Sequence, residues 1–384
     1  MTGSARRFLP LIVGMGFALG LTAPIELLYA TRFHIGAVGM GLFLFATSIG
    51  MVAVDVLGTR VVPRVDARAA LTLGLVGFGV SVAILGVAPT YEVLLVGRVV
   101  QGFAAGVLLG AGLQGALRVT ASQERALGNF NAALLFGSAV GAPAGGLLAG
   151  VVAGTAGFRI VFLTCTALCF TVAVLLRVLL PPLEPSRRVP TEVGWPKLAG
   201  RAGSRLALVL GAAGDFVRGA VVYTAIPLAG AAHHFSPALI GAAVGLLSAV
   251  EIGVLSTSAP LLVRFGAAHC VQVALVLGVA SAAVLAIAAN PVVYLAGSVL
   301  FGFVVAVATI GPPLVIVALA DEPATGLAAF RISSGLGMLI GTTGAGVGAE
   351  AMGTSAVFVL VGGVLLGGVA LAHSVGQQVR TAAA

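Results

Sequence analysis

The chain has 384 residues, of which 59% are hydrophobic and only 8% are charged, and its mean hydropathy is +1.16. No water-soluble domain of this length can bury so much apolar surface, so the composition excludes a soluble protein and indicates a membrane protein. The formal net charge of +8 comes mainly from arginines in short loops, so we interpret it as a sign of membrane topology rather than of nucleic-acid binding.

Twelve apolar runs follow one another along the chain, and each has the roughly 20 residues that a helix needs to cross a bilayer. The first run follows Arg6 and Arg7 and is similar to a signal peptide, but it continues to about Ala30, so we expect an uncleaved first helix. The predicted spans are 8–31, 36–58, 68–89, 91–117, 127–152, 158–180, 205–230, 238–263, 268–289, 291–318, 327–350 and 353–375.

One connection is long, and it falls near the middle of the chain. Pro181 to Ser204 is rich in proline and charge and holds the only tryptophan and the only lysine. We interpret residues 181–204 as a cytoplasmic linker between an N-terminal six-helix bundle, 1–180, and a C-terminal six-helix bundle, 205–384. The predicted fold class is an all-α membrane protein with twelve transmembrane helices in these two bundles.

The second half of the sequence repeats the first half at an offset of about 200 residues. LVGRVVQGF, Leu95–Phe103, matches LAGSVLFGF, Leu295–Phe303, and Arg64 pairs with Arg264 at the same offset. A repeat of this length indicates a duplicated six-span bundle rather than a solenoid. Many secondary transporters consist of two such halves, with the ligand site between them near the bilayer midplane.

The basic residues predict an orientation, because cytoplasmic loops carry an excess of arginine and lysine. With the N-terminus in the cytoplasm, nearly all basic residues lie inside and only Arg32 and Arg159 face out. Both termini are then cytoplasmic. The abundance of alanine and glycine and the use of arginine over lysine indicate a bacterium with GC-rich DNA, so we expect a multi-pass protein of the inner membrane.

Two charged residues of the first half are expected to lie at similar depth. A charged side chain deep in the membrane is costly and is a functional-site candidate by default. At about 1.5 Å per residue, Glu26 lies about five residues from the outer end of span 1 and Arg98 about seven residues from the outer end of span 4, which are similar depths. We expect the two to pair, with protonation of Glu26 freeing or engaging Arg98. The alternative is an ion pair that only fixes helix packing.

The second half has a charged cluster of its own. Asp215 and Arg218 lie at i and i+3 on one face of span 7, and Glu251 lies at similar depth in span 8. Two carboxylates can share one guanidinium, and the less satisfied acid can then take up a proton near neutral pH. We interpret the three residues as a proton-coupling site. A neutralised triad that locks spans 7 and 8 together is the alternative.

Three further polar residues are candidates for lining a substrate cavity. They are Gln101 in span 4, Asn131 near the start of span 5 and Tyr223 in span 7. Each is equally consistent with a hydrogen bond between membrane helices, which is the commoner role of such residues.

Two stretches carry a resemblance to a known family. In span 4, LLVGRVVQGFAAG resembles the R-x-x-Q-G signature of the major facilitator superfamily, with Arg98 and Gln101 at the matching positions. Span 5, GNFNAALLFGSAVGAPAGG, resembles the signature G-x8-G-x3-G-P-x-x-G-G of its drug–proton antiporters. The matching residues, which the resemblance implicates in gating, are Gly137, Gly141, Gly145 and Gly146, with the proline displaced by one position to Pro143.

The loop after span 2 resembles the family's G-x-x-x-D-R-x-G-R-R gating loop more loosely. In GTRVVPRVDARAA, Arg64 and Arg68 fit the pattern, whereas Pro63 stands where the aspartate belongs and Asp66 where the second glycine belongs. Asp55, one helix turn before the loop, is the candidate to replace the missing acid. With the repeat, the resemblance covers essentially the whole chain and implies export by alternating access.

Several functions are excluded by what the sequence lacks. It has no G-x-x-x-x-G-K-S/T phosphate loop, no metal-ligand cluster and no nucleophile–base set, so we expect neither an enzyme nor a cofactor other than the proton as coupling ion.

The leading hypothesis is proton-coupled efflux of a small hydrophobic or cationic compound, such as a drug. The alternatives are a porter of small polar metabolites, such as sugars or amino acids, and a non-transporting membrane sensor. The expected partners are the substrate, protons and the lipid bilayer, without nucleic acid, and the expected state is a monomer.

Overall fold

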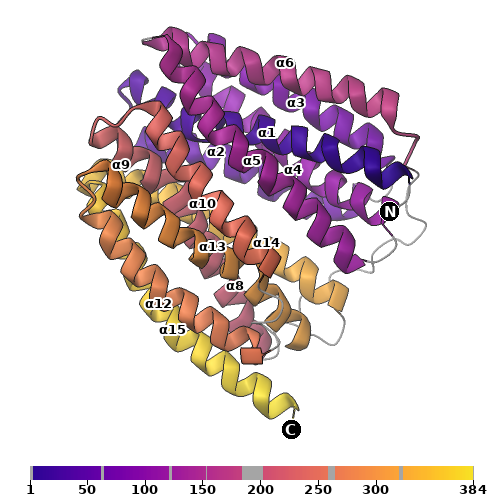
Figure 1. Cartoon of the computed structure of the whole chain (residues 1–384), viewed down its shortest axis with the longest axis vertical. Helices are drawn as coiled ribbons and strands as arrows, with labels where there is room; N and C mark the ends of the chain where they lie inside the picture. Colours follow the sequence, from indigo (N-terminus) through magenta and orange to yellow (C-terminus); the bar gives the residue numbers. More distant parts are fainter. Residues whose placement is uncertain are drawn as a thin grey trace. The chain divides into compact units, whose positions relative to one another are not determined.

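The computed structural model describes residues 3–61, 65–120, 123–152, 154–183, 202–257, 264–319 and 323–383 (Figure 1). These residues are almost entirely helical, and no strand occurs among them. The predicted all-α membrane fold is therefore confirmed. Most of the predicted linker, residues 184–201, lies outside the described residues.

The long helices follow the order of the predicted spans, with ends that differ by a few residues. The helices of the first half are α1 (Gly3–Ala30), α2 (Ala37–Val61), α3 (Ala67–Val87), α4 (Tyr91–Val119), α5 (Gln123–Val151) and α6 (Thr155–Leu179), with a short 3₁₀ turn, η1 (Thr31–Phe33), after α1. The helices of the second half are α8 (Ala202–Ala220), continued by η3 (Val221–Ala225) and α9 (Ile226–Ala232), then α10 (Pro237–Thr257), α12 (Ala267–Ala286), α13 (Pro291–Leu319), α14 (Pro323–Met352) and α15 (Thr354–Ala383).

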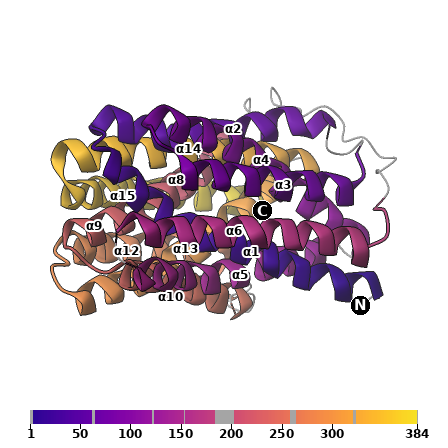
Figure 2. The same cartoon turned by 90° about the horizontal axis from the view of Figure 1, so that it is seen from above.

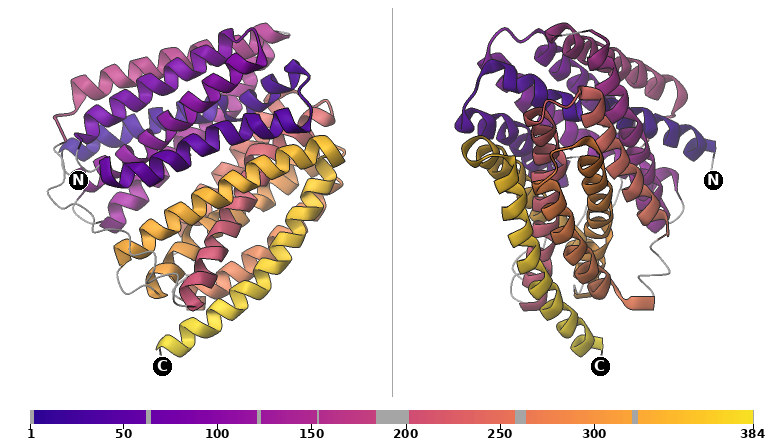
Figure 3. Two further views of the ribbon diagram at one scale, coloured as in Figure 1. Left: turned by 180° about the vertical axis from the view of Figure 1, so that it is seen from behind. Right: turned by 60° about the vertical axis from the view of Figure 1, so that its left-hand side comes forward.

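Eleven helical segments within the described residues are long and apolar enough to cross a membrane, with α8, η3 and α9 counted as one. The remaining long helix, α14, has 30 residues and packs along α8. It corresponds to the predicted span 327–350, which has the basic residue Arg331 near its start. Figure 3 shows α15, in yellow, running to the C-terminus of the second half.

The chain folds as two compact units. The first comprises residues 1–190 together with 236–248, and the second comprises residues 191–235 and 249–384. The first half of α10 thus packs with the first unit, whereas the predicted boundaries 1–180, 181–204 and 205–384 stay a prediction. In the first unit α1 lies along α5 and α6, as Figure 2 also shows, and in the second unit α8 lies along α14.

The sequence repeat reappears as repeated packing inside the units. A Cβ atom on Gly141 of α5 would collide with the carbonyl oxygen of Phe17 on α1, and one on Gly341 of α14 would collide with the carbonyl oxygen of Phe216 on α8. Backbones can approach this closely only where the side chain is a hydrogen, which is why small residues are enriched between membrane helices. Each unit therefore holds its first and fifth helices together by the same glycine-dependent contact.

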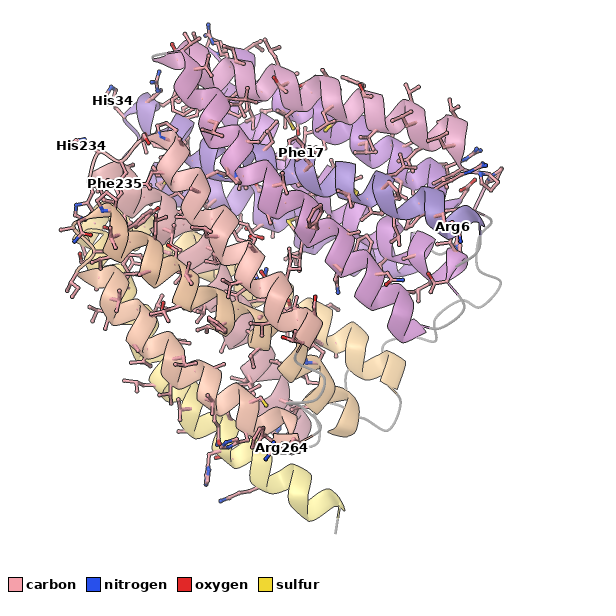
Figure 4. The ribbon with its side chains drawn as sticks, viewed as in Figure 1. Arg6, Phe17, His34, His234, Phe235 and Arg264 are labelled. Atoms are coloured by element: carbon pink, nitrogen blue, oxygen red, sulfur yellow. The ribbon has the colours of Figure 1, made fainter. Side chains whose placement is uncertain are left out.

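Labelled residues locate the two ends of each unit. Arg6 lies near one end of α1 and His34 lies just beyond the other end, while His234 and Arg264 mark opposite ends of the second unit (Figure 4). Both histidines adopt positive φ angles, 50° and 56°, in the connection that follows the first long helix of each unit. The two connections are thus built alike.

The first long helix of the second unit contains an irregular turn. The five residues of η3 are π-helical, and the Thr224 hydroxyl donates a hydrogen bond of 3.1 Å to the Gly219 carbonyl five residues earlier. A π-helical turn holds one more residue than the α-helix around it and frequently occurs near functional sites. Here it follows Arg218 by less than one turn.

Candidate functional site

The charged cluster of the first unit joins three helices. Arg98 of α4 forms an ion pair with Glu26 of α1 and donates a hydrogen bond of 2.6 Å to the Gln101 side-chain oxygen. The Gln101 amide in turn donates to the second carboxylate oxygen of Glu26. The Arg98 guanidinium also lies 4.4 Å from the centre of the Phe43 ring on α2 and bonds the Phe43 carbonyl at 3.4 Å. The pairing of Glu26 with Arg98 that their depths indicated is present.

This first cluster is closed and electrically balanced. Glu26, Arg98 and Gln101 are all buried, and both oxygens of the single acid have donors. A buried ion pair is tolerated when further hydrogen bonds satisfy its remaining polar atoms, because each charge has lost its hydration. The arrangement fixes α1, α2 and α4 together, whichever role it has in transport.

The charged cluster of the second unit joins four helices. Arg218 of α8 contacts Glu251 of α10 and the hydroxyl of Thr309 on α13, each at 2.5 Å. Asp215 lies farther from the same guanidinium, at 3.8 Å, and its other oxygen accepts a hydrogen bond from Ser334 of α14. The spacing of Asp215 and Arg218 on one helix face therefore does bring all three predicted residues together.

The two acids of this second cluster are not equivalent. Glu251 is 1% exposed and takes the short contact with Arg218, whereas the Asp215 side chain is 19% exposed and has only the long one. A carboxylate that lacks a close cation in a membrane protein is costly as an anion. Asp215 is thus the less closely paired and the more exposed of the two acids.

Three contributors were not expected from the sequence. Thr309 and Ser334 supply hydroxyls to the second cluster, and Phe43 supplies a ring and a carbonyl to the first. Hydroxyl and aromatic side chains are common in membrane helices, so none of the three carries a distinguishing signal. Only their partners, which are charged, could be recognised in advance.

The predicted cavity-lining residues fall in different environments. Gln101 belongs to the first cluster, where it bonds both charged residues. Tyr223 is 38% exposed on the π-helical turn, and Asn131 is exposed on α5. Their roles in binding a substrate stay predictions.

The predicted gating residues of the loop after α2 are only partly described. Arg64 and the side chain of Asp55 lie outside the described residues. Arg68, in the first turn of α3, donates a hydrogen bond of 2.8 Å to the carbonyl of Leu180, just after the end of α6.

The glycines of α5 contact two different helices. A Cβ on Gly137, Gly141 or Gly145 would meet backbone atoms of α1, whereas one on Gly146 would meet the carbonyl of Pro237 in α10. The ring of Pro143 lies against Gly245 of α10, within the same unit, and α5 remains one helix through this proline. Close packing is therefore present on two faces of α5, while a gating role of the same residues stays a prediction.

Comparisons with known proteins agree on one family. A sequence model of the Major Facilitator Superfamily matches residues 8–320, which is most of the chain. A Mycobacterium tuberculosis protein named "Probable multidrug-efflux transporter" is 35% identical over 123 residues, 29% of this chain and 26% of that protein. The "Multidrug resistance protein 1" of Bacillus subtilis is 27% identical over 135 residues, 35% of each chain. The chain thus matches only about a quarter to a third of these relatives' length.

Solved structures of similar fold cover nearly the whole chain. A bacterial homologue of the human lysosomal transporter Spinster has a TM-score of 0.79 at 14% identity, covering 99% of each chain. The nucleoside transporter NupG has a TM-score of 0.73 at 14% identity, covering 98% of this chain and 99% of its own. At such identities the likeness concerns the fold alone.

Proposed function

The chain belongs to the major facilitator superfamily, and on that premise we propose that it is a proton-coupled antiporter that exports a small hydrophobic or cationic compound by alternating access. As a transporter of this family it is not an enzyme. We further propose that the proton is its coupling ion, that it acts as a monomer in a bacterial inner membrane, and that both termini are cytoplasmic.

The observation that carries the proposal is the imbalance of the second cluster. Among the described side chains, two acids, Asp215 and Glu251, share one cation, Arg218, and Glu251 holds the closer contact. The side chain of Arg331 on α14 lies outside the described residues. Protonation of Asp215 removes the surplus negative charge, and loss of that proton restores it. A group that alternates between these states at membrane depth is what coupling to a proton gradient requires.

In the proposed cycle, Asp215 and the substrate use the same site in turn. A proton taken up from the outside neutralises Asp215 and weakens the hold on a cationic or polarisable substrate, which leaves. Release of the proton to the inside restores the anion and permits the next substrate to bind. Arg218 and Glu251 stay paired and keep the surrounding helices in place, and Ser334 holds the Asp215 carboxyl in one orientation.

Export rather than uptake is supported by two independent features. The glycine spacing of α5 is similar to the antiporter signature, and two relatives that match part of the chain have multidrug efflux or multidrug resistance in their names. The coupling ion and the substrate of this chain are inferred from the second cluster and the signature together.

The test is substrate-driven proton movement in vesicles reconstituted with the purified protein and loaded with a pH-sensitive dye. Ethidium, a permanently charged hydrophobic cation, serves as the probe, and protein-free vesicles are the control. External ethidium should enter in exchange for internal protons, so the internal pH should rise. Ethidium uptake without a pH change would contradict proton coupling. The same response to a sugar or an amino acid but not to ethidium would favour the porter of polar metabolites, and no flux of any probe would favour a sensor.

A further inference from the structure

A short segment after α6 is bound to the first unit by charged side chains from two other helices. Residues Leu180–Leu183 leave the end of α6 and run across the start of α3. The backbone N–H of Ala67 donates a hydrogen bond of 3.1 Å to the carbonyl of Leu183, and the Leu183 side chain is buried. We call this arrangement the linker clasp, since Leu180–Leu183 includes the first residues of the predicted linker.

Asp66 is the centre of the linker clasp. Its carboxylate accepts hydrogen bonds from the backbone N–H groups of Arg68 at 2.7 Å and Ala69 at 3.4 Å, so it caps the start of α3. The same oxygen accepts a bond of 3.1 Å from the N–H of Leu183, 117 residues away in the sequence. One side chain thus begins a helix and holds a distant segment of chain.

Two arginines complete the clasp from either side. Arg118, at the end of α4, donates a hydrogen bond of 2.5 Å to the Leu183 carbonyl. Arg68 donates to the carbonyl of Leu180, just after α6, at 2.8 Å and to that of Arg177, in the last turn of α6, at 3.5 Å. Carbonyls at a helix C-terminus attract a cation, because they lack intrahelical partners and carry partial negative charge. Three charged side chains are therefore directed at backbone atoms of one short segment.

One donor of Arg68 in the linker clasp is unsatisfied. The Nε atom of Arg68 is buried without a hydrogen-bond partner within the described part of the chain. An unsatisfied buried donor lowers the stability of the folded protein. Placing Arg68 against the end of α6 therefore costs free energy, because Nε loses its hydrogen bond to water. The hydrogen bonds from Arg68 to the carbonyls of Leu180 and Arg177 must offset this loss.

We propose that Asp66, with Arg68 and Arg118, is a positioning device that fixes the start of the linker to the first unit and thereby sets the rate of the transport cycle. This inference rests on the proposed function. The linker joins the two predicted bundles, and alternating access requires the bundles to move against each other. Fixing one end of a connecting segment shortens its free length and narrows the range of positions that the partner bundle can sample.

Asp66 here has a role that the family resemblance does not assign to it. In the sequence this residue stands where a glycine of the gating loop belongs, and Pro63 stands where the loop's aspartate belongs. Asp66 thus stands three positions after the place of the aspartate in the family's loop motif, and it binds the segment Leu180–Leu183.

The first arm of the test measures whether the clasp holds the segment. Leu183→Cys serves as a reporter in a Cys270→Ser background, since the two remaining cysteines are buried, and its reaction with a maleimide is followed in vesicles. Asp66→Ser keeps a good helix cap but is too short to reach the Leu183 N–H, so labelling should become at least about fivefold faster. Asp66→Asn keeps the acceptor oxygen and is the matched control, with labelling close to that of the parent.

The second arm measures ethidium transport by the same Asp66 variants without the reporter. Asp66→Ser should lower the maximal rate about threefold while leaving KM within about twofold of the parent, because the rate of bundle movement changes and the binding site does not. Unchanged labelling in Asp66→Ser would overturn the proposal, and so would faster labelling with a parental rate. Labelling needs no substrate, so failure of the proposed function, seen as no transport by the parent, is distinguishable from failure of the clasp.

Discussion

The two buried charge clusters differ in how their acids are satisfied. In the first unit one acid, Glu26, faces one arginine, and Gln101 and the Phe43 ring enclose the pair. In the second unit, as far as its side chains are described, two acids face one arginine, and hydroxyl groups complete the contacts. The same fold, duplicated, therefore holds a balanced cluster in one copy and an acidic one in the other.

This difference suggests that the two clusters have different roles, one in holding helices together and the other in coupling transport to the proton. A balanced, closed cluster is most stable in one protonation state, since adding or removing a proton would leave a buried charge unpaired. An acidic cluster with a partly exposed carboxyl has two states of more similar energy. We therefore propose that the first cluster mainly fixes helices and that the second exchanges the proton.

The largest effect is expected from breaking the balanced cluster. Arg98→Ala leaves Glu26 buried without its cation, which should lower the free energy of unfolding by about 3–5 kcal/mol. Thermal unfolding in detergent measures the loss, with the exposed Arg32→Ala as the control. The neutral double variant Glu26→Gln/Arg98→Gln should recover most of the stability. A stable Arg98→Ala protein would show that Glu26 is readily neutralised and would remove the distinction between the clusters.

The next effect concerns coupling at the acidic cluster. Asp215→Asn mimics the protonated acid and keeps an oxygen for Ser334, so the protein should stay folded while proton-driven ethidium transport falls about a hundredfold. Exchange of ethidium without a gradient should persist only at raised ethidium concentrations, because the neutral side chain weakens the binding of the cation without blocking the site. The folded double variant Glu26→Gln/Arg98→Gln should keep its coupling. If instead the double variant loses coupling and Asp215→Asn keeps it, the proton is carried by the first cluster.

A smaller effect is expected from the hydroxyl that orients Asp215. Ser334→Ala removes a hydrogen bond to a charged group, a loss of about 1.5–3 kcal/mol, so proton-driven transport should fall about tenfold. Ser333→Ala is the matched control, because that hydroxyl bonds the Phe330 carbonyl of its own helix. Equal effects of the two substitutions would mean that Ser334 acts through helix stability alone.

The smallest effect concerns the ring that covers Arg98. Phe43→Leu and Phe78→Leu both shorten a buried aromatic side chain, but only the first loses a guanidinium contact. The difference between the two losses of unfolding free energy should be about 1 kcal/mol, the size of a desolvated cation–π contact. Equal losses would show that the Phe43 ring contributes only its apolar volume.

The sequence predicted the charged pairs because their positions obey simple geometry. The similar depths of Glu26 and Arg98 follow from counting residues from helix ends, and the i, i+3 spacing of Asp215 and Arg218 places them on one face. The helix order and the all-α fold follow equally from the length of the apolar runs. These features depend on local periodicity, which a single sequence displays.

Contacts between a side chain and backbone groups that are distant in the sequence could not be predicted in this way. Asp66 bonds the N–H of Leu183, and Arg68 bonds the carbonyl of Leu180, but every residue has such groups and no sequence pattern identifies the ones in reach. Ser334 was missed for a related reason, since a hydroxyl in a membrane helix usually bonds its own helix, as Ser333 does. The unequal exposure of Asp215 and Glu251 could be seen only in the structure, because it depends on how the helices pack around each side chain.

The π-helical turn Val221–Ala225 records how the two halves diverged in length. Before the turn, Phe17 and Phe216 occupy matching places against glycines of the fifth helix and are 199 residues apart. After it, His34 and His234 share a left-handed backbone and are 200 residues apart. The turn thus accommodates the one residue by which this helix exceeds its counterpart in the first half. Removing one residue from the turn would give the first helices of the two units the same spacing between these points.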